Sequence, residues 1–292
     1  MVPSSAGVAA SARAASASRS IAIQGPSQWP TSPLTRRGDP GLAWNGLQLL
    51  VWSGVHNGVP LVDGSAFHVP RSDWEKVPTG GPSGPVMASA TDGGGYVVLV
   101  KRSGAALDPS KGVWRALPRL SDRRAAFRAV TSLDNATYAL VTTRHDGDVS
   151  VAIARLDADA EAWKLGPSSS HAAHARDISL TVDRGGLAVW SDGERVAHYD
   201  VERRAWTDGD GLTVPDGLGA PQVVGTDDRL VAVDRDGHHV PAAYDRNAGR
   251  WVALPGARKA VGPGASAVAD ADDVIVWGGV DHPGPWDWTI RW

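Results

Sequence analysis

The sequence predicts an all-β fold, a six-bladed β-propeller with four-stranded antiparallel blades, and three observations lead to that prediction. A tryptophan followed by a short exit segment, most often ending in proline, recurs along the chain at steps of 40, 49, 43 and 45 residues. Short apolar runs of strand length recur in the same phase, and turn-forming Asp, Asn or Gly residues precede each run. A period of about 45 residues with several strands per unit is typical of propellers, because one blade cannot bury both of its faces alone.

The tryptophan motif supplies the last strand of each unit. Its clearest copy is YDRNAGRWVALP (Tyr244–Pro255), which reads as a strand, a polar turn, a tryptophan strand and a Leu-Pro exit. The repeat tryptophans are Trp74, Trp114, Trp163, Trp206 and Trp251. Repeated aromatic residues bury large apolar areas, so we expect these tryptophans, with Tyr199 and Tyr244, to pack between strands and not to bind a ligand.

The apolar runs supply the second strand of each unit. They are Leu49–Val55, Tyr96–Arg102, Tyr138–Thr143, Leu187–Gly193, Leu230–Gly237 and Val274–Val280. Their length and β-branched content favour buried strands. Turn signals such as Asn45–Gly46 and Asp134–Asn135 precede them, and these residue types tolerate the positive φ of tight hairpins. Each unit therefore reads as inner strand, hairpin, second strand, loop, third strand, short turn and tryptophan strand.

The two ends of the chain predict how the ring closes. The sixth unit stops at DWTIRW (Asp287–Trp292), its third strand, and the N-terminal segment SQWPTSP around Trp29 is an orphan copy of the tryptophan motif. We predict that this segment is the outer strand of the last blade, because closure removes an exposed sheet edge. Residues 27–292 would form one domain, and the Ala/Ser-rich residues 1–26 a disordered tail. A seven-bladed ring is the alternative, but only six second strands can be counted.

Composition narrows the classes of function. The chain contains no cysteine, which excludes disulfides, thiolate metal sites and cysteine nucleophiles, and its net charge of -3 gives no argument for nucleic acid binding. The sequence contains no run of about 18 apolar residues, so we expect no transmembrane helix. The N-terminus lacks the continuous apolar stretch of a secretory signal, and a disordered tail is favoured over a transit peptide. We expect a monomer without cofactor or metal.

Several segments resemble kelch repeats. The strand ends VWSGV and VWGGV resemble that family when taken with YDRNAGRWVALP, and LAWNGLQLLVWSGV (Leu42–Val55) is similar to the bacterial kelch-like style. The resemblance covers residues 27–292 and is most specific in the first, fifth and sixth units. It implies a propeller like the central domain of galactose oxidase without the copper site, since the crosslinked cysteine of that site has no counterpart here. It also implies binding roles and, for bacterial members, secretion.

Histidines and arginines mark one face of the predicted ring. In a propeller, the loops between strands two and three and the connectors between blades open over the central channel. Seven of the nine histidines fall in these segments, namely His56, His145, His171, His174, His238, His239 and His282. The connectors carry Arg37, Arg124 and Arg176, whose guanidinium groups can grip a carboxylate through two hydrogen bonds. Trp286 lies nearest a loop and could stack on a sugar ring, although packing is the favoured interpretation.

Three interpretations of this face stay open: ordinary solvated loops, an anion- or sugar-binding mouth, and a metal or acid–base site of His with Asp. We expect a non-catalytic binding propeller that takes a protein or glycan ligand there. The alternative is a carbohydrate-active enzyme, such as a sugar-acid isomerase, mutarotase or lyase. In that case Arg37, Arg124 and Arg176 would clamp a carboxylate, and His145 or His239 would act as acid or base. Convergence of the three arginines in one pocket discriminates between the two classes.

Overall fold

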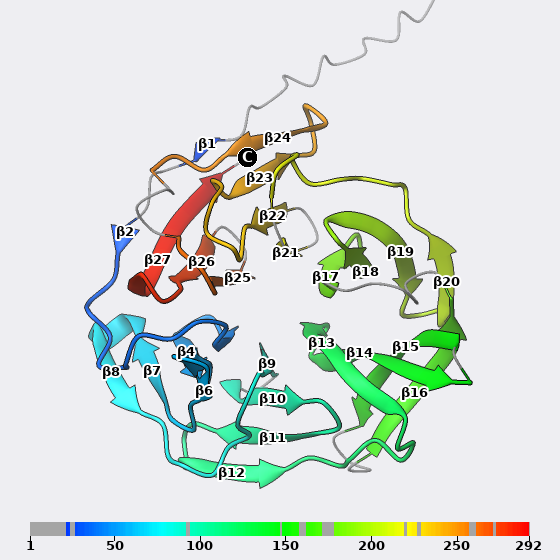
Figure 1. The fold of residues 1–292 in the computed structure, drawn as a ribbon, viewed down its shortest axis with the longest axis horizontal. Helices are drawn as coiled ribbons and strands as arrows, with labels where there is room; N and C mark the ends of the chain where they lie inside the picture. The colour runs from blue at the N-terminus through cyan, green and yellow to red at the C-terminus, as the bar shows by residue number, and fades with distance from the viewer. Residues whose placement is uncertain are drawn as a thin grey trace, which may run out of the picture.

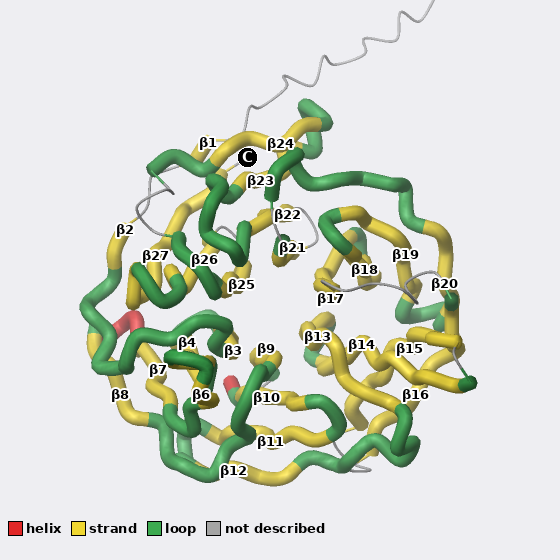
Figure 2. Tube along the Cα trace, viewed as in Figure 1, coloured by secondary structure: helices red, strands yellow, loops and turns green. Residues whose placement is uncertain are grey.

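The structure is a six-bladed β-propeller, as the sequence predicts, with the blades following one another once around a ring (Figure 1). It is a computed structural model that describes residues 22–23, 27–91, 94–146, 148–157, 162–170, 178–218, 221–226, 229–256, 261–270 and 273–291. Nearly all of the described chain is strand or loop (Figure 2). A short 3-10 turn spans Val69–Arg71, and the described residues contain no α-helix.

Blades 1 to 5 each contain four antiparallel strands that follow chain order from the inside of the ring to the outside. Blade 1 contains β3 (Gly41–Trp44), β4 (Gln48–Trp52), β7 (Gly64–His68) and β8 (Asp73–Lys76). Blade 2 contains β9 (Met87–Ala90), β10 (Tyr96–Val100), β11 (Ser103–Asp108) and β12 (Val113–Ala116). Blade 3 contains β13 (Ala125–Leu133), β14 (Ala136–His145), β15 (Asp148–Asp157) and β16 (Ala162–Ser169).

Blades 4 and 5 repeat this arrangement. Blade 4 contains β17 (Ile178–Asp183), β18 (Gly186–Ser191), β19 (Glu194–Asp200) and β20 (Ala205–Asp208). Blade 5 contains β21 (Gln222–Thr226), β22 (Arg229–Val233), β23 (Ala242–Asp245) and β24 (Arg250–Ala253). A separate two-stranded hairpin, β5 (Val55–His56) and β6 (Val59–Pro60), projects from the loop between the second and third strands of blade 1.

Blade 6 is closed by the N-terminal segment, which confirms the predicted closure. Its own strands are β25 (Ser266–Asp270), β26 (Asp273–Gly278) and β27 (His282–Arg291). The fourth position is taken by β1 (Ala22–Ile23) and β2 (Ser27–Gln28), which pair antiparallel with β27 and lie along its outer side (Figure 1). The closing segment therefore includes residues 22–23, within the stretch that the sequence analysis assigned to the tail. Residues 1–21 lie outside the described residues.

The hydrophobic core consists of six clusters, one between each pair of neighbouring blades. Between blades 3 and 4, for example, Leu140 and Ile153 pack with Leu180 and Leu187. The apolar surface of each blade is thus buried against its neighbours. Stability in such an array lies mainly in the interfaces, so the ring depends on every neighbour being in place.

The repeat tryptophans form a second set of links around the outside of the ring. Each one lies on an outer strand, and its indole N–H donates to a backbone carbonyl at the exit of the preceding blade. The pairs are Trp74–Pro30 (3.0 Å), Trp114–Pro78 (2.7 Å), Trp163–Pro118 (3.0 Å), Trp206–Pro167 (2.8 Å) and Trp251–Thr213 (2.7 Å). The rings of Tyr199 and Tyr244 lie against Trp206 and Trp251. These aromatics pack between strands, as predicted.

Candidate functional site

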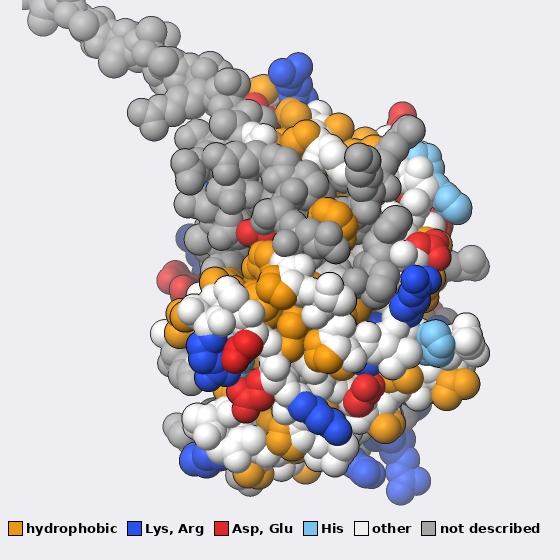
Figure 3. Space-filling model, turned by 90° about the vertical axis from the view of Figure 1, so that its left-hand side faces the viewer, with side chains coloured by type: hydrophobic (Ala, Val, Ile, Leu, Met, Phe, Trp, Pro, Cys, Tyr) orange, Lys and Arg blue, Asp and Glu red, His pale blue; other side chains and the backbone are white. Residues whose placement is uncertain are grey.

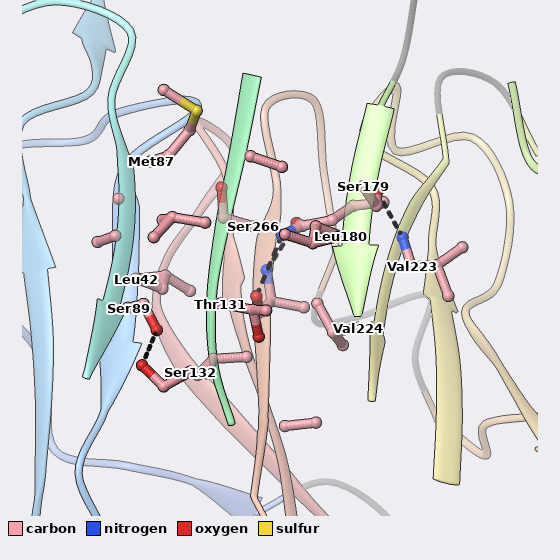
Figure 4. A pocket seen from close by; sticks show the side chains of 18 of the residues that line it. Leu42, Met87, Ser89, Thr131, Ser132, Ser179, Leu180, Val223, Val224 and Ser266 are labelled. Carbon is pink, nitrogen blue, oxygen red and sulfur yellow. Dashed lines mark hydrogen bonds between the residues drawn. The ribbon is translucent and has the colours of Figure 1, made fainter. Parts of the chain in front are cut away.

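A cavity of about 490 Å³ lies on the ring axis, between the inner strands of all six blades (Figure 4). Each inner strand starts at a connector and ends at a hairpin, so the connector ends of all six meet at one mouth. Asp39 and Pro85, which precede inner strands, line that mouth, whereas Asp134, which follows β13, lines the opposite end. The connector mouth is the face to which the sequence analysis assigned the ligand.

Many polar side chains of the cavity wall bond to neighbouring inner strands. Ser89 and Ser132 bond across blades 2 and 3, and Ser179 accepts the backbone N–H of Val223 across blades 4 and 5, as Figure 4 shows. The side-chain amide of Gln222 both donates to and accepts from the backbone of Ala267, at 3.2 and 3.0 Å. These hydrogen bonds join neighbouring blades along the channel.

The rim of the connector mouth is tied together across blades 1, 5 and 6. Arg235, from the loop after β22, forms an ion pair with Asp39, from the connector before β3. The backbone N–H of Asp39 donates to Gly264, and that of Gly264 donates to Arg235, both at 2.7 Å. Gly264 has φ +72, and a Cβ there would lie 2.6 Å from the Cα of Gly38, so this close approach requires glycine.

Arg37 is buried beneath the β5–β6 hairpin and does not line the cavity. Its guanidinium donates to the carbonyl oxygens of Ser53 (2.9 Å) and Asp63 (3.1 Å) and forms an ion pair with the Asp63 carboxylate. The two carbonyls belong to the two stems of the hairpin loop. Arg37 therefore links the two ends of this loop through hydrogen bonds.

The other predicted arginines do not join Arg37 in a described pocket. Arg124 is exposed on the connector before β13, and its Nε lies 3.8 Å from the carboxylate of Asp122. It does not line the cavity either. Arg176 lies outside the described residues. The two predicted arginines that the structure describes therefore occupy separate places, one buried and one in solvent.

The predicted histidines are spread over the loops of several blades. His56 lies on β5 beside Asn57, and His145 ends β14, exposed and paired with Asp146 at 2.7 Å. His171 and His174 lie outside the described residues, and so does the side chain of His282 at the start of β27. Within the described part of the chain, no histidine lines the cavity.

Trp286 lies on β27, opposite Gln28 of the closing strand and Val276 of β26. Its side chain is partly buried and packs against the hydrophobic cluster between blades 5 and 6. The side chains of Trp288 and Trp292 are outside the described residues. The position of Trp286 is that of a packing residue.

His239 forms a dyad with the buried carboxylate of Asp234. The carboxylate accepts the backbone N–H groups of Asp236 (3.0 Å), His238 (2.9 Å) and His239 (2.7 Å), and it lies 3.1 Å from Nδ1 of His239. The contact with Asp234 engages Nδ1, which leaves Nε2 as the outward ring nitrogen. That atom faces Gly217 in the connector between blades 4 and 5, and the imidazole is half exposed.

A buried charge cluster between blades 4 and 5 escaped the sequence analysis. Asp183, at the end of β17, is fully buried and accepts from Arg195 and His198 of its own blade and from Arg246 of blade 5, the last at 2.6 Å. Burial alone would raise the pKa of Asp183, but the bonds from His198 and Arg246 and the arginine charges lower it to about 2. In the sequence Asp183 reads only as a hairpin residue.

Arg195 is the hub of this cluster. It also binds the carboxylate of Asp210, and its guanidinium lies 5.7 Å from the ring centroid of Trp190. The hydrogen bond from Arg195 is the main cause that lowers the pKa of Asp210. The described residues include no group of three His, Asp or Glu side chains suited to a metal ion. The cluster therefore reads as an inter-blade link.

Comparison with known proteins gives no identification. No protein-family model matches the chain, and no curated protein is significantly similar to it. Among the helices in the described residues, none is long and apolar enough to cross a bilayer. Positive and negative side chains are interspersed on the side of the ring that Figure 3 shows, which fits the small net charge of the chain.

Proposed function

We propose that the protein is a kelch-like, non-catalytic binding propeller that takes a protein or glycan ligand on the connector face. The observation that carries the proposal is the β5–β6 hairpin beside the cavity mouth. Its tip is Asn57–Gly58, with φ of 50 and 77, the backbone of a two-residue type I′ turn. Val59 and Val62 on this loop are 62% and 59% exposed.

The hairpin has the properties of a preformed contact element. Arg37 holds its stems, and Val55 of β5 forms a bridge with Gly38, next to the rim residue Asp39. A rigid loop loses little conformational entropy on binding, and exposed apolar side chains on it supply the hydrophobic contact. Pro60 on the outer strand of the hairpin lacks an N–H, so side chains, and not strand pairing, would make the contact.

A glycan array and a surface-binding assay with candidate proteins test the proposal, with Val59→Asp as the probe variant. We expect binding to fall about tenfold or more, because a charge replaces an apolar contact. The matched control is Val113→Asp, since Val113 on β12 is 55% exposed and lies on the outer strand of blade 2. A ligand that binds wild type, V59D and V113D equally would place the contact surface elsewhere.

The Asp234–His239 dyad favours a second candidate, a carbohydrate-active enzyme acting on sugar acids. An imidazole oriented by a buried carboxylate can serve as a general base. The positions of Arg37 and Arg124 argue against this candidate. Neither side chain lines the cavity, so these two arginines do not form the predicted carboxylate clamp there. Incubation with a panel of uronic and sialic acids, followed by NMR, tests this candidate. Turnover that His239→Asn abolishes supports it, and absence of turnover by wild type eliminates it.

A further inference from the structure

Two of the four asparagines in the chain precede a glycine, and both of these Asn-Gly pairs lie at hairpin turns. They are Asn45–Gly46, between β3 and β4, and Asn57–Gly58, between β5 and β6. Asparagine is chemically labile in this setting, because glycine has no Cβ to shield its backbone nitrogen from the preceding side-chain amide. The structure distinguishes the two pairs by the hydrogen bonds that hold each asparagine side chain.

The side-chain amide of Asn45 is held at both of its polar atoms. Its Nδ2 donates to the carbonyl oxygen of Gly94 in blade 2 at 2.8 Å. Its Oδ1 accepts the backbone N–H groups of Leu47 (3.0 Å) and Gln48 (2.8 Å) in the same turn. Any reaction that closes a ring through this amide disturbs all three bonds, so they oppose reaction at Asn45.

Asn57 is exposed at the tip of the β5–β6 hairpin and has no comparable restraint. Among the described residues, its one side-chain hydrogen-bond contact is with His56, whose Nε2 lies 3.2 Å from Nδ2 of Asn57 at the protein surface. Gly58 is exposed too, and a Cβ built on it would meet no atom within 4 Å. The ladder pairs Val55 with Pro60 and His56 with Val59, so strand pairing does not use the N–H of Gly58.

We propose that Asn57 is a site of spontaneous deamidation, which makes the β5–β6 hairpin change as the protein ages. The backbone nitrogen of Gly58 attacks Cγ of Asn57 and forms a new C–N bond. The Cγ–Nδ2 bond breaks, and ammonia leaves with the proton from the Gly58 nitrogen. Water then opens the resulting succinimide. Opening at Cγ gives aspartate, and opening at the backbone carbonyl carbon gives isoaspartate.

Both products alter the hairpin surface. Each places a carboxylate two residues from the exposed side chain of Val59, and isoaspartate also adds a methylene to the backbone of a two-residue turn. A longer turn no longer matches the pairing of β5 with β6. The chemical step stands independently of the proposed function, whereas its effect on ligand binding rests on that function.

Peptide mapping by mass spectrometry tests the chemical step. The full chain is incubated for several weeks at physiological temperature and mildly alkaline pH, and the peptides containing Asn45 and Asn57 are compared. Asn57 should deamidate about tenfold or more faster than Asn45, because reaction at Asn45 disturbs three hydrogen bonds. Isoaspartyl methyltransferase should label the peptide that contains residue 57.

Unfolding the chain in urea provides the control for the structural argument. Both Asn-Gly pairs are then free of their native contacts, and the two rates should become similar. Equal rates in the folded protein would overturn the proposal. A preference for Asn57 that persists unchanged in urea would overturn it as well, because the difference would then come from neighbouring residues in the sequence.

The variant Asn57→Gln separates the modification from its consequence. Its side chain keeps the amide but would have to close a larger ring, so N57Q should stay unmodified on ageing. For a ligand that V59D weakens, aged wild type should bind more weakly than fresh wild type, whereas N57Q should bind equally before and after ageing. Equal binding by fresh and aged wild type would refute the effect on binding. A ligand that neither V59D nor ageing weakens would count against the proposed function, while the mapping result would stand.

Discussion

At the scale of single residues, buried charges do structural work that their type alone does not reveal. Arg37 reads in the sequence as a ligand clamp because it precedes an inner strand, yet it is fully buried with backbone carbonyls as partners. Asp183 reads as a turn residue, yet it joins two blades through the side chains of two arginines and a histidine. Both roles depend on partners that lie 12 to 63 positions away along the chain, so no local pattern contains them.

The lowered pKa of Asp183 predicts acid sensitivity. Because its folded pKa of about 2 is below the usual aspartate pKa of 3.8, the carboxylate contributes stability above the unfolded pKa and loses it as pH falls toward 2. Asp183→Asn should cost about 3 kcal/mol at neutral pH and flatten the fall in Tm between pH 5 and pH 2. Thermal melts at several pH values check this. Asp146→Asn, on an exposed loop, is the control, and equal acid profiles for wild type and D183N would contradict the assignment.

The role of Arg37 as a loop clamp predicts that Arg37→Lys destabilises the protein. A lysine keeps the charge but cannot reach Ser53 and Asp63 together, so we expect a loss of about 2 kcal/mol in urea unfolding. The β5–β6 hairpin should also become sensitive to limited proteolysis. A variant as stable as wild type, with an intact hairpin, would show that the clamp contributes nothing.

At the scale of elements, the features that could be predicted were those that depend on residue types close together in the sequence. The Asp134–Asn135 turn has φ of 48 and 61, as its residue types require, and the strands on either side follow from it. The bulge in β13 between Phe127 and Ala129 is not such a feature, because it depends on which neighbouring blade each of these two residues packs against. The cavity wall likewise draws side chains from six blades. Its composition therefore depends on the ring, and sequence reasoning placed arginines there that the structure puts elsewhere.

The tryptophan links predict two separable contributions within an outer strand. Trp206→Phe keeps the contact with Tyr199 but loses the bond to Pro167, and should cost about 1 kcal/mol. Trp206→Ala loses the packing as well and should cost about 3 kcal/mol. Urea unfolding measures both, and Trp251→Phe, which loses the equivalent bond to Thr213, should match W206F. If W206F proved as damaging as W206A, the hydrogen bond and not the ring would dominate.

At the scale of the whole molecule, the ring is a repeat array whose ends are joined. In an open array the terminal units are the weakest, because each lacks one neighbour. Here the N-terminal segment removes both ends together: β1 and β2 pair with β27, and Pro30 accepts the indole N–H of Trp74 in blade 1. Trp29 continues the seam by packing against Trp44 and Phe67. We therefore expect the described blades to unfold together and not one at a time.

Deletion of residues 1–35 tests this closure directly. The truncated chain would expose the edge of β27 and leave Phe67 and Trp74 uncovered, so we expect a fall in Tm of more than 10 °C, broader melting and a tendency to associate through the free edge. The matched control is a permutant in which residues 22–35 follow residue 292 through a short linker. It supplies the same strand from the C-terminal end, in the same antiparallel direction beside β27, and it should recover most of the lost stability. A truncated chain that melts like the full-length protein would show that the N-terminal segment pairs with β27 without holding the ring closed.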